Sequence, residues 1–538
     1  MKNYLFFALL ILTLSCKNLA VDNQQTVAQS ADTLKDFREF KVLDSKYIDN
    51  DAMWTPFNKD LKGFSEATYT ALKPLILEQN IPTLQKNISE GKLTYEKLVL
   101  FYLYRIRKFD RENKLSLNAV IALNPNAVKE ARQKDKQPRP LLGYSVFGMP
   151  ILLKDNINAA GMPTTAGAAA LQQNMAEDAF IVKQLKNNGA LILGKANLSE
   201  WAYFFCGDCP SGYSAVGGQT LNPYGRRIFD TGGSSSGSGV AVAANFCVAA
   251  VGSETSGSIL SPSSQNSLVG LKPTVGVLSR TGIIPISSTL DTPGPMTKNV
   301  IDNGIMLEAM TGFDKDDSAS VNLESEPVGN LINTSLKGKR FGAFKGLMED
   351  SLYVEALSKL KNEGAEIIEI EQQQIDLPGF IRLLNLDMKK DLPVYFQKNA
   401  SAAITLKSLE DVMEYNRKDS LRSAPYGQEL FQGILDDKGS LEDLERIKDT
   451  LSTNGKLFFE GPMNKHNLDG ILSINNFHAG YAAVAKYPAM TVPMGYQKDG
   501  KPRGLTFIAK PFQEIALLQW ALAFEQVSKA RKLPVNYH

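Results

Sequence analysis

Two serine-rich clusters and one lysine are the residues of this chain best suited to covalent chemistry. Glycines and serines predominate in the first cluster, residues 231–239, and recur in the second, residues 252–258. A serine that directly follows a glycine in a tight loop presents its hydroxyl and nearby backbone N–H groups to one point. Acyl transfer requires this combination, because the hydroxyl attacks a carbonyl carbon while the N–H groups stabilise the oxyanion. The second cluster therefore predicts a nucleophile with an oxyanion hole beside it.

The first cluster has three simpler explanations. A flexible linker would not run directly into the apolar residues 240–244. A P-loop would need a Gly-Lys-Ser/Thr sequence, which does not follow. A purely structural turn remains an alternative. A catalytic loop is favoured, because glycine lets the backbone approach a substrate closely and adopt dihedral angles that other residues avoid.

Histidine is scarce, so the base that activates a serine must be sought elsewhere. The chain has only His466, His478 and His538, all far from the serine clusters in sequence. This argues against a Ser-His-Asp hydrolase and against a histidine-rich zinc site. Lys154 follows the apolar residues 151–153 and should be buried at a strand end, where desolvation lowers the pKa of a lysine. A fall of about three units from ~10.4 would make Lys154 a base near pH 7.

The elements that must position these residues alternate between strands and helices. Helical patterns are expected at 65–110 and 179–188, strands at 149–153 and 190–193, strand–helix blocks at 240–251 and 339–369, and a charged helical excursion at 400–465. Such alternation predicts an α/β fold with a mixed or mostly parallel sheet covered by helices.

Composition is that of a globular protein with no strong electric field. Hydrophobic residues make up 43% and charged residues 22% of the 538 residues. Lysine and arginine number 59 against 57 aspartates and glutamates, a formal charge of +2, so nucleic acid is not expected as a partner.

The N-terminus has the features of an export signal. Residues 5–14 are apolar but too few to span a bilayer, so residues 1–15 are predicted to be a signal peptide. Ser15-Cys16 resembles a bacterial lipobox, although Thr13 stands where such boxes usually have leucine; cleavage would leave Cys16 to carry a lipid anchor. Ordinary signal-peptidase cleavage is the alternative. We expect an exported, membrane-anchored lipoprotein of the bacterial cell envelope, on its periplasmic or surface side, with a polar tether over residues 16–45 and an N-terminal extension over 46–80.

Several segments together resemble the amidase signature family. They are Gly-Met-Pro-Ile-Leu-Leu-Lys-Asp-Asn at 148–156, Gly-Gly-Ser-Ser-Ser-Gly-Ser at 232–238, Gly257-Ser258, and Gly-Leu-Lys-Pro-Thr at 270–274. The resemblance implies one large amidase-signature domain over residues 81–535, with a central mixed β-sheet covered on both faces by helices. Within the family, the chain most resembles bacterial peptide amidases, which release ammonia from C-terminal peptide amides. The segments that support this resemblance are residues 197–202, 218–224 and 487–495.

The family resemblance also implies roles for individual residues. It implies a Ser–cis-Ser–Lys triad with Lys154 as base, Ser234 on a cis peptide bond and Ser258 as nucleophile, the relay being supported by Ser235. The implied oxyanion hole consists of the backbone N–H groups of Thr255, Ser256, Gly257 and Ser258. No metal and no cofactor are implied.

Two departures from the family pattern concern the substrate. Ser256 stands where many relatives carry glycine, and residues 472–478 form a shorter segment than the corresponding peptide-amidase loop. The expected activity is hydrolysis of a carboxamide C–N bond, on peptide amides or alternatively on other small or aryl amides. A solute-binding lipoprotein without catalysis is a rival from another class. An amidotransferase subunit acting on charged tRNA is a third, against which the export signal argues. The oligomeric state stays open.

The cysteines allow several interpretations. Cys206 and Cys209 have the spacing of a thioredoxin-type redox motif. A local disulfide in an oxidising compartment and a pair of free thiols are the alternatives. Cys247 lies in an apolar run and is expected in the core.

Overall fold

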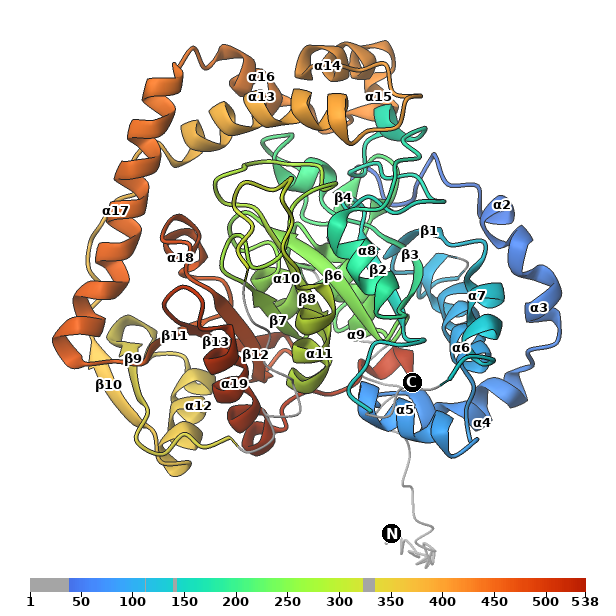
Figure 1. Ribbon diagram of the computed structural model, residues 1–538, viewed down its shortest axis with the longest axis horizontal. Coiled ribbons are helices and arrows are strands. Elements are labelled where there is room, and N and C mark those ends of the chain that lie inside the picture. Colours follow the sequence, from blue (N-terminus) through green and yellow to red (C-terminus); the bar gives the residue numbers. More distant parts are fainter. Residues whose placement is uncertain (1–37, 112, 139–142, 323–333) are drawn as a thin grey trace, which may run out of the picture. The chain divides into compact units, whose positions relative to one another are not determined.

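The computed structural model describes residues 38–538 except 112, 139–142 and 323–333 (Figure 1). Residues Glu39–His538 form one compact unit. The predicted signal peptide, Cys16 and the tether up to residue 37 lie outside the described residues. The compact unit begins within the segment expected as a tether, since Asp44 forms a β-bridge with Gly218. Among the described residues, no helix is both long and apolar enough to cross a membrane.

A mixed β-sheet runs through this unit. Its order is β1-β3-β2-β6-β8-β7-β12-β13-β11-β9-β10, and a separate two-stranded sheet joins β4 and β5. The strands of the main sheet are β1 (Val120–Leu123), β2 (Pro150–Lys154), β3 (Leu191–Ala196), β6 (Ala249–Glu254), β7 (Val269–Lys272), β8 (Thr292–Thr297), β9 (Arg340–Phe344), β10 (Glu366–Ile370), β11 (Gly470–Ile474), β12 (Ala489–Tyr496) and β13 (Pro502–Ile508); β4 is Tyr213–Ser214 and β5 is Gly218–Gln219. Strand β2 is parallel to both β3 and β6, whereas β6 is antiparallel to β8.

Helices cover both faces of the sheet, as the family resemblance implied. Helices α9 and α10 pack on one face, whereas α11, α12 and α19 pack together on the other. The α-helices are α2 (Asn50–Trp54), α3 (Asn58–Lys62), α4 (Glu66–Ile76), α5 (Ile81–Ser89), α6 (Tyr95–Ile106), α7 (Ala127–Lys134), α8 (Phe180–Asn187), α9 (Ser236–Ala243), α10 (Leu260–Gln265), α11 (Val300–Met310), α12 (Ser351–Asn362), α13 (Phe380–Lys398), α14 (Leu409–Lys418), α15 (Ser420–Ser423), α16 (Glu429–Asp436), α17 (Leu441–His466), α18 (Ala479–Val484) and α19 (Glu514–Ser528).

Most predicted elements are confirmed, but the order within residues 240–251 is wrong. The sequence predicted a strand followed by a helix, whereas helix α9 comes first and strand β6 follows. Helix α9 is buried along its whole length, so it lacks the polar face that distinguishes most helices. A short run that is apolar on all sides cannot be assigned to strand or helix from periodicity alone.

Helices α13 to α17 form a layer outside the sheet, at the upper and left edges of Figure 1. The excursion expected at 400–465 is therefore confirmed. Its apolar side chains, such as Leu392, Phe431 and Leu444, belong to a hydrophobic cluster that also contains Trp201 and Phe205. Most buried apolar residues of the strands belong to a different and larger cluster, which includes Cys247 as predicted. A third cluster packs Phe458 of α17 with Ile471 of β11. Helices α13, α14 and α16 and the first part of α17 thus have a hydrophobic core of their own, whereas the second part of α17 packs on the sheet.

Candidate active site

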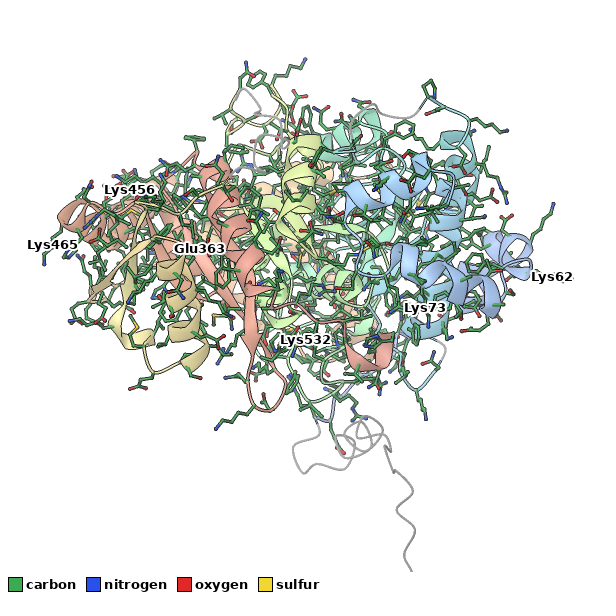
Figure 2. The ribbon with its side chains drawn as sticks, turned by 90° about the horizontal axis from the view of Figure 1, so that it is seen from below. Lys62, Lys73, Glu363, Lys456, Lys465 and Lys532 are labelled. Atoms are coloured by element: carbon green, nitrogen blue, oxygen red, sulfur yellow. A yellow bond between two sulfur atoms is a disulfide. The ribbon has the colours of Figure 1, made fainter. Side chains whose placement is uncertain are left out.

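Lys154 is buried at the carboxyl end of β2, in contrast to surface lysines such as Lys62, Lys456 and Lys465 (Figure 2). Its Nζ lies 2.7 Å from Ser234 Oγ. The same nitrogen lies 2.9 Å from the carbonyl oxygen and 3.0 Å from Oγ of Ser253. Parallel pairing of β2 with β6 brings these groups together, because the carboxyl ends of parallel strands meet at one edge of a sheet.

Burial changes the protonation of Lys154. It lowers the pKa of this lysine to about 7, because the ammonium form loses its hydration, while the carboxylates of Asp291 and Glu254 oppose the shift. At neutral pH a large fraction of Lys154 is therefore an uncharged amine, whose lone pair can accept a proton from a hydroxyl. Two serine hydroxyls are within reach of that lone pair.

The two serine clusters are bound to each other immediately before α9. The Gly233–Ser234 peptide bond is cis, as the resemblance implied. Ser235 donates its hydroxyl to the carbonyl of Ser253 at 3.1 Å, and its backbone N–H donates to the carbonyl of Ser258 at 3.2 Å. Ser235 therefore links the segment of Ser234 to both ends of the second cluster.

Residues 255–258 form a tight loop after β6. Glu254 closes this loop, because one of its carboxylate oxygens accepts hydrogen bonds from the N–H groups of Ile259 at 2.7 Å and Leu260 at 2.9 Å. Gly257 has a φ of +86°, which favours glycine. Among the described residues, no backbone carbonyl accepts a hydrogen bond from the N–H groups of residues 255–258. These N–H groups are therefore free to bind an oxyanion, next to the partly exposed Ser258.

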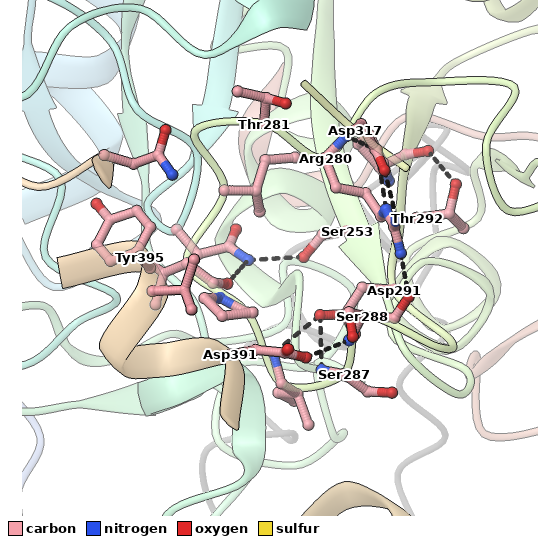
Figure 3. Close-up of a pocket in the computed structure, with 18 of the residues that line it drawn as sticks. Ser253, Arg280, Thr281, Ser287, Ser288, Asp291, Thr292, Asp317, Asp391 and Tyr395 are labelled. Carbon is pink, nitrogen blue, oxygen red and sulfur yellow. Dashed lines mark hydrogen bonds and ion pairs between the residues drawn. The ribbon is translucent and has the colours of Figure 1, made fainter. Parts of the chain in front are cut away.

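A cavity of about 450 Å³ opens beside this loop. Ser253 and Thr255 are among its lining residues, and Tyr395 of α13 lies across from Arg280, which is paired with Asp317 (Figure 3). Sites of this volume commonly hold small organic ligands. The cavity therefore gives a ligand access to the serine loop.

Asp291 fixes the loop from the side of this cavity. One of its carboxylate oxygens accepts a hydrogen bond from Thr255 Oγ1 at 2.5 Å. The other accepts from the N–H groups of Ile286 at 2.8 Å and Ser287 at 2.9 Å. Burial raises the pKa of Asp291 to about 6, against the effect of these hydrogen bonds. Its carboxylate couples the cavity wall to the predicted oxyanion loop.

Comparison with known proteins identifies the family of this chain. A family model described as Amidase matches residues 97–432. The chain belongs to the amidase signature family. It is 37% identical over 484 residues to a probable amidase of Arabidopsis thaliana, covering 85% of this chain and 92% of that protein.

Solved structures of amidases share its fold. An amidase family protein from Bacillus anthracis superposes with a TM-score of 0.84 and 36% identity, over 91% of this chain and 99% of that one. The native peptide amidase from Stenotrophomonas maltophilia gives a TM-score of 0.79 and 37% identity, over 85% of this chain and 98% of that one. The chain is therefore an amidase, a hydrolase of a family characterised by a Ser-Ser-Lys triad, which excludes the alternative of a binding protein without catalysis.

Several residues of this amidase site escaped the sequence analysis. Ser253 and Glu254 lie within the second serine cluster, and Asn156 ends the segment that contains Lys154, so proximity in sequence was an available signal. Asn156 Nδ2 donates to Ser253 Oγ at 2.9 Å. Asp291 belongs to no motif, and only the fold brings it to Thr255.

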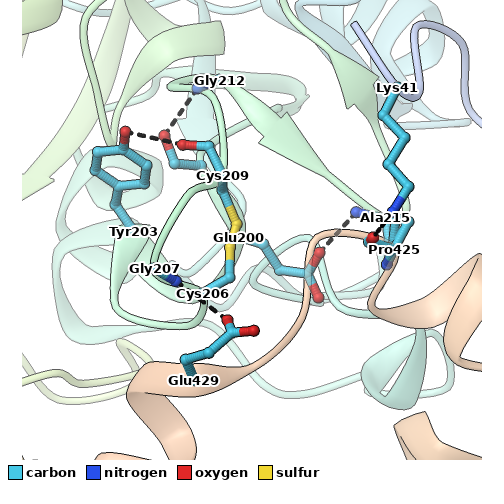
Figure 4. The surroundings of a disulfide bond; sticks show 11 residues. Lys41, Glu200, Tyr203, Cys206, Gly207, Cys209, Gly212, Ala215, Pro425 and Glu429 are labelled. Carbon is cyan, nitrogen blue, oxygen red and sulfur yellow. Dashed lines mark hydrogen bonds between the residues drawn. A yellow bond between two sulfur atoms is a disulfide. The ribbon is translucent and has the colours of Figure 1, made fainter.

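The structure pairs Cys206 and Cys209 in a disulfide, one of the alternatives left open by their spacing (Figure 4). The hydroxyl of Tyr203 donates to the carbonyl of Cys209 at 3.0 Å, and the N–H of Gly207 donates to Glu429 of α16 at 3.3 Å. The disulfide loop thus connects the amidase core to the outer helical layer.

A buried ion pair supports the strand ends beside Lys154 and predicts a large effect on stability. Lys195 Nζ lies 3.0 Å from a carboxylate oxygen of Asp155, and the two side chains are 0% and 1% exposed. Asp155→Ala leaves the buried ammonium without its counter-charge, so we expect the free energy of unfolding to fall by about 3 to 5 kcal/mol. Urea denaturation followed by circular dichroism measures this loss.

The matched control is Glu355→Ala, which removes the exposed partner of Lys359 on α12. An exposed pair contributes at most about 1 kcal/mol. If Asp155→Ala lost no more than the control, the buried pair would not be the support inferred here.

Proposed function

We propose that this amidase hydrolyses C-terminal peptide amides, with Ser258 as nucleophile, Ser234 as proton relay and Lys154 as general base. The observation that carries the proposal is the contact of 2.7 Å between Lys154 Nζ and Ser234 Oγ, made by a buried lysine whose pKa is about 7. A lysine of ordinary pKa would be charged at neutral pH and could not accept a proton.

The first half of the reaction transfers the acyl group to Ser258. Neutral Lys154 takes the proton of Ser234, Ser234 takes the proton of Ser258, and Ser258 Oγ forms a bond to the amide carbon. The N–H groups of residues 255–258 stabilise the oxyanion of the tetrahedral intermediate. When the C–N bond breaks, the proton held by Lys154 returns through Ser234 to the nitrogen, and ammonia leaves.

The second half restores the enzyme. Water loses a proton through the same relay to Lys154 and attacks the ester carbon of the acyl-enzyme. The bond to Ser258 breaks, Ser258 Oγ recovers the proton, and the carboxylic acid is released. Ser235 supports the relay by holding the two serine segments together. No metal or organic cofactor is required by these steps.

Peptide amides are favoured over smaller substrates by two observations. The cavity of about 450 Å³ is larger than a simple carboxamide such as acetamide needs. A peptide amidase is also among the solved structures with the same fold. The shorter segment 472–478 borders the nucleophile loop, because Asn476 lies against Gly257, so it bears on the choice between peptide amides and other small or aryl amides.

The place of action is proposed from the sequence of the N-terminus. The apolar residues 5–14 followed by Ser15-Cys16 support export and attachment to the membrane through a lipid on Cys16, in the bacterial cell envelope. An exported amidase would meet peptides rather than charged tRNA, which favours hydrolysis over a role as an amidotransferase subunit.

Ammonia release from a panel of carboxamides tests the proposed substrate class. The panel contains dipeptide and tripeptide amides, acetamide and an aryl acylamide. Hydrolysis of the aryl acylamide releases aniline instead of ammonia, so aniline is measured for that substrate. We expect the highest kcat/KM for the peptide amides, because they fill the cavity. The corresponding peptide acids, which contain no terminal carboxamide, are the control. Turnover of only the small or aryl amides would refute the peptide specificity and leave the amidase chemistry in place.

A further inference from the structure

Asn156, a residue that lines the amidase cavity, has an unsatisfied hydrogen-bond acceptor. It follows Lys154 by two residues, is 3% exposed and lines the cavity together with Ser253 and Thr255. Its Nδ2 donates to Ser253 Oγ at 2.9 Å and to the carbonyl oxygen of Ile284 at 3.4 Å. Its Oδ1 is buried and has no hydrogen-bond partner among the described residues.

The orientation of this amide is set by its neighbours. Turning the side-chain amide of Asn156 by 180° would place Oδ1 against the carbonyl oxygen of Ile284, where two acceptors would face each other. Both Nδ2 donors are used in the orientation observed. Leaving a buried acceptor unpaired is unfavourable by about 1 to 3 kcal/mol, so the expected partner is a donor that arrives with the ligand.

The hydrogen-bond network shows where that donor belongs. Asn156 Nδ2 and Lys154 Nζ both donate to Ser253 Oγ, and Lys154 also contacts Ser234. Asn156 is therefore joined through Ser253 to the pair Lys154 and Ser234, which in the proposed relay delivers a proton to the leaving nitrogen. A carboxamide nitrogen carries N–H groups, whereas the leaving oxygen of an ester carries none.

We propose that Asn156 Oδ1 accepts a hydrogen bond from the N–H of the substrate's leaving amide nitrogen. This contact orients the nitrogen as it becomes tetrahedral, so that its lone pair is left for the proton that Ser234 returns. It also makes the site selective for carboxamides over esters of the same acyl group. The inference rests on the proposed function, because it assigns a substrate contact to that reaction.

The test is the ratio of kcat/KM for a peptide amide to kcat/KM for the methyl ester of the same peptide. We expect Asn156→Ala to lower this ratio about tenfold, because only the amide loses a hydrogen bond. Asn156→Asp keeps an acceptor oxygen but removes both Nδ2 donors, so it should retain the amide preference even if both rates fall. Asn399→Ala is the matched control, since Asn399 lines the same cavity without contacting Ser253, and should keep the wild-type ratio.

Two results would overturn the inference. The first is an Asn156→Ala variant that is slowed equally toward amide and ester, which would give Asn156 only a positioning role through Ser253. The second is a loss of amide preference in Asn156→Asp as large as that in Asn156→Ala. This result would show that the preference depends on the N–H groups of Asn156 Nδ2 and not on Oδ1. Circular dichroism confirms folding, and Asn156→Leu, which keeps the side-chain volume, replaces Asn156→Ala if the latter does not fold.

Failure of the proposed function gives a different result. In that case the wild-type protein releases no ammonia from any peptide amide, before any variant is compared. If only the role of Asn156 Oδ1 is wrong, the wild-type protein still releases ammonia from peptide amides and one of the two results above is observed.

Discussion

Replacing Ser258 by alanine is expected to reduce kcat for carboxamide hydrolysis by roughly 10⁴- to 10⁶-fold. Without its hydroxyl the loop can still bind an oxyanion through its N–H groups, but no acyl-enzyme can form. Ammonia release at saturating substrate measures the loss. Residual activity above the uncatalysed rate is expected, because removal of a nucleophile leaves the binding and oxyanion contributions in place.

The matched control for Ser258 is Ser261→Ala, three residues further along the chain. Ser261 is also partly exposed, and its backbone N–H donates to the carbonyl of Gly257 at 2.8 Å. Its hydroxyl has no part in the proposed relay, so kcat should change less than about threefold. Mass spectrometry after reaction with a serine-directed phosphonofluoridate should locate the adduct on Ser258. An adduct on another serine, or a Ser258→Ala variant with substantial activity, would disprove the assignment.

Replacing Lys154 by alanine should reduce kcat/KM by about 10² to 10⁴-fold, the usual contribution of a general base. In the wild-type protein the base must be uncharged, so kcat/KM should rise with pH and level off above the pKa of Lys154, which is about 7. Lys154→Arg should be as inactive as Lys154→Ala, because an arginine stays protonated at all accessible pH values. These expectations are checked by measuring kcat/KM from pH 5 to pH 9 for the wild-type protein and for both Lys154 variants.

Lys398→Ala provides the control for this pH profile. Lys398 is an exposed lysine of α13 that lines the same cavity. Its removal can alter KM, but the midpoint near pH 7 should remain. Two results would show that a group other than Lys154 titrates. One is a shift of the midpoint of the pH profile in Lys398→Ala, and the other is a midpoint near pH 7 that persists in a still active Lys154→Ala variant.

The sequence contained enough information to propose the reacting groups but not to predict their surroundings. Lys154, Ser234 and Ser258 could be selected because rare arrangements of common residues, a lysine after an apolar strand and serines between glycines, occur in short segments. Glu254 and Asn156 are ordinary residue types, and their importance depends on which backbone groups the fold brings to them. Asp291 is joined to Thr255 only by the antiparallel pairing of β8 with β6.

The fold was predictable to a similar extent. Strands β2 and β3 and helix α8 follow from apolar runs with clear ends, such as Gly189, whose φ of +84° stops the helix. The order of α9 and β6 was not predictable, because both are buried throughout and residues 240–251, which join them, are apolar except for Asn245. Spacing alone left open whether Cys206 and Cys209 are bonded, since the answer depends on a loop held by α16.

The hydrophobic core behind α13 is separate from the main core of the sheet, and this separation bears on how new substrate specificities arise in such proteins. Lys154 and the serine loop rest on the core of the sheet, whereas the wall supplied by α13, including Tyr395, rests on the core of the outer helices. Mutations that repack the outer helices can therefore accumulate in a gene lineage while the hydrolytic chemistry is inherited unchanged. In directed evolution, a library restricted to α13 and the helices behind it should yield altered substrate ranges with few inactive clones.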